Sequence, residues 1–96
     1  MTSTTMTGRR HYVDANTAEW RLVDGEAVIV HVQSSHYYAL NETGTLVWTL
    51  LAEGALTADE VSARVAEAYA VPVERVADDV SRVITELHAE GLLQER

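Results

Sequence analysis

Four histidines are the first side chains in this sequence that could carry chemistry: His11, His31, His36 and His88. Imidazole exchanges protons near neutral pH and is a common metal ligand. No two of these residues have the spacing of the His-Glu-x-x-His zinc motif. His31 and His36 flank one predicted turn, but no carboxylate in that turn would orient them, as a ligand histidine normally requires. The sequence therefore predicts neither a metal site nor a bound cofactor.

Nucleophilic and phosphate-binding motifs are also missing from the sequence. Ser34 and Ser35 precede a histidine, but the members of a Ser-His-Asp triad converge through the fold and not through adjacency. There is no cysteine, which excludes a thiol nucleophile and a disulfide framework. The five glycines are scattered, so they form no phosphate-binding loop. We therefore expect a protein that is not an enzyme.

Strand patterns occupy the region between residues 18 and 40. Glu19–Val23 alternates in polarity, and Asp24-Gly25 then favours a two-residue hairpin turn. Ala27–Val32 is rich in β-branched residues, which favour strands. His36–Leu40 follows a second short turn. These segments predict an antiparallel meander of three strands.

Helical patterns begin at Asn41, which is a favourable N-cap for a first helix that Gly54 ends. A Thr-x-x-Glu capping box predicts a second helix over roughly residues 58–70. A third helix runs from Pro72 to about Glu90 and has a sustained apolar stripe. The predicted fold class is α+β, with a three-stranded antiparallel sheet followed by three helices. This order is similar to a winged helix-turn-helix.

Length and composition predict one domain in 96 residues. Residues 1–10 are rich in Ser and Thr and are expected to form a disordered tail, with the domain over 11–96. They do not resemble a signal peptide, and no apolar run reaches the ~18 residues of a membrane span, so we expect a cytoplasmic protein. The formal net charge is −8, from 7 basic and 15 acidic residues. This balance disfavours nucleic acids and anionic membranes as partners.

A winged helix-turn-helix could bind DNA through its last helix, but the charges there have the wrong sign. Arg75 and Arg82 share that helix with five acidic residues, among them Asp78 and Asp79. The aspartates are expected to pair with these arginines along the helix. Phosphates would be repelled, so no nucleic-acid partner is expected.

The third strand, His36–Leu40, has no proline, lysine or central glycine to block pairing at its edge. An open edge of this kind is a template on which an extended peptide can add a strand. In that case Tyr38→Pro should remove a donor of the new ladder. The same edge could pair with itself, so the chain is expected to be a monomer or a weak homodimer. The alternative is that Tyr37 and Tyr38 are ordinary packing residues.

The segment Ala27–Leu51 resembles the PqqD family, and so does the ending, with Asp79-Val80, Leu87 and Gly91-Leu92-Leu93. The family pattern is a hydrophobic strand, a turn, an aromatic pair, Leu-Asn-x-Thr-Gly and a helix with Trp and Leu-Leu. The resemblance covers about residues 18–93. Two positions depart from it: His31 stands where the family often has Asp, and Ser35 where it usually has Gly. Residues that match the pattern are Tyr37, Tyr38, Leu40, Asn41, Thr43, Gly44, Trp48, Leu50 and Leu51.

The resemblance implies a recognition element for ribosomally made, post-translationally modified peptides. A free-standing chain of this size is similar to the leader-binding proteins of lasso-peptide biosynthesis, whose partners are the precursor leader peptide, a leader protease and a cyclase. Alternatives are a PqqD-type chaperone for a radical maturation enzyme and a DNA-binding regulator. The leader is expected to pair with the third strand and lie against the third helix. The implied peptide-binding residues are His36, Tyr37, Tyr38, Ala39, Leu40, Arg75, Val76, Asp79, Val80 and Val83.

Overall fold

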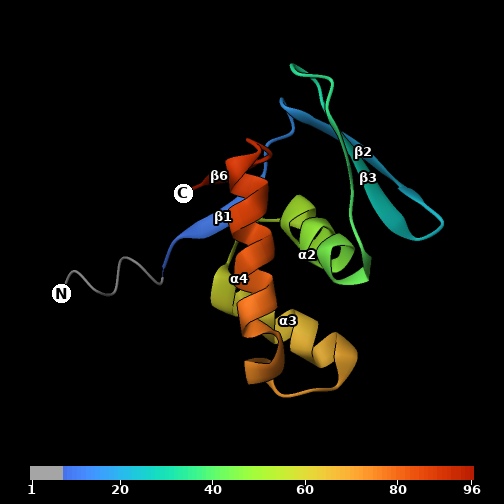
Figure 1. Cartoon of the computed structure of the whole chain (residues 1–96). Helices are drawn as coiled ribbons and strands as arrows, with labels where there is room; N and C mark the ends of the chain where they lie inside the picture. Colours follow the sequence, from blue (N-terminus) through green and yellow to red (C-terminus); the bar gives the residue numbers. More distant parts are fainter. Residues whose placement is uncertain (1–7) are drawn as a thin grey trace.

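The computed structural model describes residues 8–96 as two small sheets packed with three helices (Figure 1). Most of the tail expected over residues 1–10 lies outside the described part, and Arg10 already begins a strand. No helix within residues 8–96 is long and apolar enough to cross a membrane. The elements are β1 (Arg10–Val13), β2 (Ala18–Val23), β3 (Glu26–His31), β4 (Tyr37–Ala39), α2 (Glu42–Glu53), β5 (Leu56–Thr57), α3 (Ala58–Tyr69), α4 (Val73–Ala89) and β6 (Leu93–Glu95).

The predicted three-stranded meander is confirmed as an antiparallel sheet in the order β2-β3-β4, which we call the hairpin sheet. Asp24 and Gly25 both have positive φ, of 53° and 83°. Two positive φ angles in a two-residue loop are typical of a type I′ turn, whose twist matches that of the flanking strands. The turn fixes the register of β2 and β3, and the strand order places β2 and β4 at the two edges of the sheet.

A second sheet, which we call the terminal sheet, was not predicted from the sequence. Its order is β5-β1-β6, and both neighbours pair antiparallel to β1. β6 lies where only a short extended tail was expected, and β1 begins inside the expected disordered tail. These strands are two to four residues long. Such short segments carry no periodic pattern, so their pairing depends on the tertiary fold.

The three predicted helices are confirmed, together with two of their N-terminal caps. Asn41 Oδ1 accepts a hydrogen bond from the Gly44 N–H group at 2.8 Å, which begins α2. Thr57 and Glu60 form the complete capping box of α3. Pro72 stands at the N-cap of α4, one position before the first turn where the sequence suggested it. Local sequence therefore determines where each helix begins.

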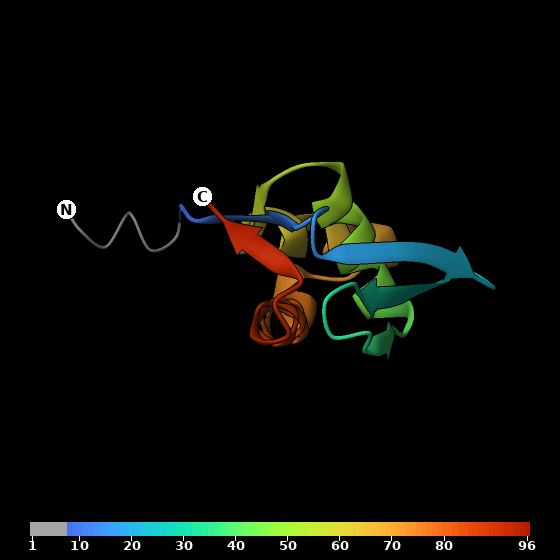
Figure 2. The same ribbon diagram turned by 90° about the horizontal axis from the view of Figure 1, so that it is seen from above.

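Trp48 of α2 is completely buried at the centre of the core. It lies between the hairpin sheet, which contributes Ile29, and the other two helices, which contribute Val65 and Val80. Viewed from above, α4 is seen almost end-on, and β4 lies beside it on the same side of α2 (Figure 2). The core thus holds an edge strand and a helix next to each other.

Candidate functional site

The free edge of β4 is determined by the hydrogen-bonding register of the hairpin sheet. The Leu40 N–H donates to the Ala27 carbonyl, and the His31 N–H donates to the His36 carbonyl, both at 2.9 Å. Hydrogen-bonded and non-hydrogen-bonded pairs alternate along an antiparallel ladder. Ile29 and Tyr38, which stand between these two pairs, are therefore the hydrogen-bonded pair of β4.

Tyr37 and Ala39 occupy the alternate positions, opposite Val30 and Val28. Their N–H and C=O groups point away from β3, and β4 has no second partner strand within residues 8–96. Four main-chain groups are thus available along the edge, two donors and two acceptors. They match the pairing positions that an added antiparallel or parallel strand requires.

Thr45 fixes the position of this edge relative to α2. Its buried hydroxyl oxygen accepts a hydrogen bond from the Ala27 N–H at 2.9 Å and lies 3.3 Å from the Leu40 carbonyl, to which it donates. A single side chain therefore joins the helix to β3 and to the end of β4. The N-cap residue Asn41 follows immediately, so the chain turns directly from the open edge into α2.

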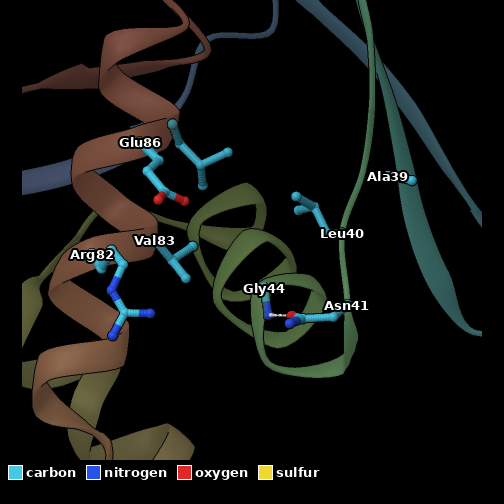
Figure 3. Close-up of a pocket in the computed structure, with 8 residues that line it drawn as sticks. Ala39, Leu40, Asn41, Gly44, Arg82, Val83 and Glu86 are labelled. Carbon is cyan, nitrogen blue, oxygen red and sulfur yellow. Dashed lines mark hydrogen bonds between the residues drawn. The ribbon is translucent and has the colours of Figure 1, made fainter.

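A depression of about 260 Å³ lies between the end of β4 and α4. Leu40 and Val83 point into it from opposite sides, and Gly44 of α2 lies between them (Figure 3). A Cβ atom at Gly44 would meet the Leu40 and Asn41 side chains at 3.3 Å, so glycine keeps this region open. We call the depression the groove; its lining residues are Ala39, Leu40, Asn41, Gly44, Arg82, Val83, Glu86 and Leu87.

Charged groups on α4 lie along one side of the groove. The Arg82 guanidinium donates to Asp79 Oδ1 at 2.8 Å, an exposed pair one helical turn apart. Glu86 reaches towards the groove from the next turn (Figure 3). The groove is therefore apolar on its floor and carries charges of both signs on its α4 side.

Tyr38 and Glu90 connect the two walls near the C-terminal end of α4. The tyrosine hydroxyl donates to Glu90 Oε1 at 2.8 Å. This hydrogen bond to a carboxylate raises the pKa of Tyr38, because it stabilises the protonated phenol. The contact holds β4 beside α4 while leaving the edge groups of the neighbouring residues unpaired.

Comparison with known proteins identifies the architecture. Residues 26–93 match the family model described as coenzyme PQQ synthesis protein D (PqqD). The chain belongs to the PqqD family. The match runs from the start of β3 through α4 to the first residue of β6 and includes both walls of the groove.

A solved structure resembles this PqqD-family chain over most of its length. It is described as TbiB1 in complex with the TbiA(beta) leader peptide. The TM-score is 0.76 and the sequence identity 25%, with 86% of this chain and 94% of the other chain covered. A search of curated protein sequences gave no significant match.

The structure places the predicted β4 residues of this PqqD-family chain in two groups. Tyr37 and Ala39 direct their main-chain groups outwards, whereas those of Tyr38 face β3. The His36 carbonyl and the Leu40 N–H also bond to β3. The expectation that Tyr38→Pro removes a donor from an added strand is corrected by this register. That substitution would instead break the β3–β4 ladder.

Only one of the five α4 residues predicted to bind the leader lines the groove. Val83 lines the groove. Val76 and Val80 are 8% and 0% exposed, so they pack in the core and offer a peptide almost no surface. Arg75 and Asp79 are exposed on α4 outside the groove lining.

The groove lining also includes residues that sequence reasoning did not name as binding residues: the exposed Arg82 and Glu86 and the buried Leu87 on α4, and Asn41 and Gly44 at the start of α2. The helical residues could have been found from spacing, because positions 82, 83, 86 and 87 share one face. Val76 and Val80 belong to the apolar stripe of this helix, but so do Val83 and Leu87, so the stripe alone does not separate core positions from groove positions.

The two departures from the family pattern lie together in the β3–β4 turn. The His31 Nδ1 atom accepts hydrogen bonds from the Gln33 and Ser34 N–H groups at 3.3 and 3.4 Å. A carboxylate at this position would accept the same bonds, which explains how histidine replaces Asp. Ser35 has φ of 62°, a left-handed conformation that favours glycine. The turn is therefore retained despite both departures.

Proposed function

We propose that this chain binds the leader segment of a ribosomally made precursor peptide as an added strand on β4. The observation that carries the proposal is the row of outward main-chain groups at Tyr37 and Ala39, which lies beside the groove. Backbone pairing would supply affinity that does not depend on leader sequence. Leader side chains that enter the groove between Leu40 and Val83 would supply selectivity.

The structural neighbour supports this function. TbiB1 was solved with a leader peptide, and its fold aligns with 86% of this chain. A neighbour solved with a leader peptide favours leader binding over a DNA-binding role. The alternative of a chaperone for a radical maturation enzyme shares the binding mode, but the comparisons do not favour it.

The expected affinity follows from opposing contributions. A disordered leader loses conformational entropy when it becomes a strand, which costs several kcal/mol. The new ladder and the apolar contacts offset this cost. We expect a Kd on the order of micromolar to tens of nanomolar. The net charge of −8 favours a leader or a partner enzyme with basic residues.

The biological role proposed here is delivery, without chemistry by this chain. The bound precursor would be presented to the leader protease and the cyclase of lasso-peptide biosynthesis, in the cytoplasm. Holding the leader next to an enzyme raises the effective concentration of the precursor at its active site. In this mechanism the protease and the cyclase need no binding site of their own for the leader.

The decisive experiment titrates a labelled leader, from the precursor encoded nearest to this chain's gene, into wild type, Ala39→Pro and Ala39→Val. Proline removes an outward N–H group, and its ring occupies the space of the incoming strand, whereas valine keeps the donor. Loss of one hydrogen bond and a close contact should weaken binding about tenfold or more. The β3–β4 ladder does not use the Ala39 N–H, so both variants should fold.

Equal affinity of folded Ala39→Pro and wild type would contradict strand addition at β4. The same variants test delivery, since Ala39→Pro should raise the KM of the leader protease for the full precursor. Processing that is equally fast with and without this chain would contradict the delivery role while leaving leader binding intact.

A further inference from the structure

Two histidines and one glutamate from distant parts of the sequence meet beside the last turn of α4. His11 lies on β1, Glu95 on β6, and His88 in the last turn of α4. In Figure 1, β1 and β6 lie to the left of α4 and β2 and β3 lie to its right, and none of the three residues lines the groove. These residues therefore form a cluster separate from the groove.

The three ligand-type atoms lie close together. His11 Nδ1 is 2.8 Å from His88 Nε2, and Glu95 Oε2 is 4.0 Å from the first nitrogen and 3.8 Å from the second. All three atoms lie within 4.8 Å of one another. A tetrahedral zinc ion with bonds of 2.0–2.2 Å separates its ligand atoms by about 3.3–3.5 Å. Shifts of roughly half an ångström in each side chain would reach that geometry.

The backbone holds the cluster in place. His11 and Glu95 are directly opposite each other in the β1–β6 ladder. His88 is joined to β6 through a tight turn at Gly91, whose φ is 77°. The Gly91 N–H donates to the His88 carbonyl at 2.9 Å, and the Leu92 N–H donates to the Leu87 carbonyl at 3.0 Å. The backbone segments that carry the three side chains would therefore lose little conformational freedom when a metal ion binds.

The surroundings of the cluster suit a metal ligand set. The His11 and His88 side chains are only 12% and 25% exposed. The Arg9 guanidinium donates to Glu95 Oε1, which leaves Oε2 directed at the two rings. Such an outer hydrogen bond commonly orients a ligating carboxylate. The positive charge of Arg9 disfavours a nearby cation, and bonds from the ion to both imidazoles would have to offset that repulsion.

We propose that His11, His88 and Glu95 form a site for a zinc-class divalent transition metal ion, with water in the fourth position. Two imidazole nitrogens and one carboxylate suit Zn²⁺, Co²⁺ and Ni²⁺, whereas Mg²⁺ and Ca²⁺ prefer oxygen ligands alone. In the metal-free protein, one of the two rings donates an N–H group to the other. When the ion binds, that ring would carry its proton on its second ring nitrogen, so that both facing nitrogens can bind the ion. The ion would join β1, β6 and α4, and so fix the helix that forms one wall of the groove.

The test is thermal unfolding of the full chain, cleared of metal with a chelator, before and after addition of ZnCl₂. Binding to the folded state alone should raise Tm by about 5–10 °C for each tenfold excess of free zinc over Kd. His88→Ala and Glu95→Gln should lose this rise. His36→Ala removes an exposed histidine from the β3–β4 turn, outside the cluster, and should keep it. MgCl₂ and CaCl₂ should give no rise with any variant.

A second measurement covers the case in which a cluster variant changes the fold. Co²⁺ added to wild type should give the intense visible absorption of a tetrahedral ion, saturating at one equivalent, and the absorption should be displaced by Zn²⁺. The proposal is overturned if wild type shows neither a zinc-dependent Tm rise nor the cobalt absorption, or if His36→Ala and His88→Ala respond equally.

Discussion

At the scale of single residues, Val83 is the α4 side chain on which the groove proposal can be tested most directly. It is half-buried and faces Leu40 across the groove (Figure 3). In Val83→Asp, a bound leader would bury a carboxylate without a partner. We expect leader affinity to fall at least about tenfold, which corresponds to roughly 1.4 kcal/mol or more. Isothermal titration with the leader checks this expectation.

Ser81→Asp is the matched control, because it adds the same charge to the same helix at an exposed position outside the groove. Its affinity should equal that of wild type apart from small long-range effects. Thermal unfolding of both variants separates weaker binding from loss of structure. A Val83→Asp variant that is folded and binds as tightly as Ser81→Asp would exclude the groove as the leader site.

Individual residues also show where sequence reasoning fails. The aromatic pair Tyr37-Tyr38 marked a strand that has an open edge, but sequence does not reveal which residue directs its N–H group outwards. That choice depends on a register set by the β3–β4 turn, where Ser35 adopts a left-handed conformation. A one-residue shift in register would exchange the roles of all β4 positions.

At the scale of elements, the contact of α2 with the hairpin sheet includes one buried hydroxyl group, that of Thr45. Thr45→Val removes the acceptor of the Ala27 N–H, which then stays buried without a partner. The free energy of unfolding should fall by about 1–3 kcal/mol. Urea unfolding followed by circular dichroism measures this loss. The variant should also weaken leader binding, because Thr45 helps to position the end of β4.

Thr49→Val controls for the loss of a hydroxyl from the same helix. The Thr49 hydroxyl donates only to the Leu46 carbonyl within α2, and its removal leaves no buried donor unpaired. Its stability should stay within about 0.5 kcal/mol of wild type. If Thr45→Val and Thr49→Val lower the free energy of unfolding equally, the hydrogen bond between Thr45 and the Ala27 N–H does not stabilise the fold.

The elements also differ in how far sequence predicts them. Asn41 and the Thr57–Glu60 capping box begin their helices through local hydrogen bonds, and the Asp24-Gly25 turn is equally local. The terminal sheet depends instead on contacts between the two ends of the described chain, such as His11 with Glu95. No local pattern encodes that pairing. The cluster proposed to bind a metal ion has no local pattern either, since its histidines are 77 positions apart.

At the scale of the whole molecule, Asp14 connects the two sheets, because it lies in the turn between β1 and β2. Its carboxylate accepts hydrogen bonds from the Asn16 N–H, the Thr17 hydroxyl and the Gln94 amide of β6, at 2.8–3.0 Å. The last two bonds are the largest causes that lower the pKa of Asp14 from 3.8. The ionised form is therefore favoured in the folded state.

This shift predicts how stability depends on pH. A carboxyl group whose pKa is lower in the folded state stabilises the protein above its unfolded pKa and loses that effect as pH falls through its folded pKa. We expect the free energy of unfolding of wild type to exceed that of Asp14→Asn at pH 7. The difference should shrink once pH falls below about 3.8, the ordinary pKa of this group. Urea unfolding of both proteins between pH 2 and pH 7 measures it. If the difference in free energy of unfolding stays constant over this range, the charge of Asp14 does not contribute to stability. If the difference grows at low pH, the pKa of Asp14 is not lowered in the folded state.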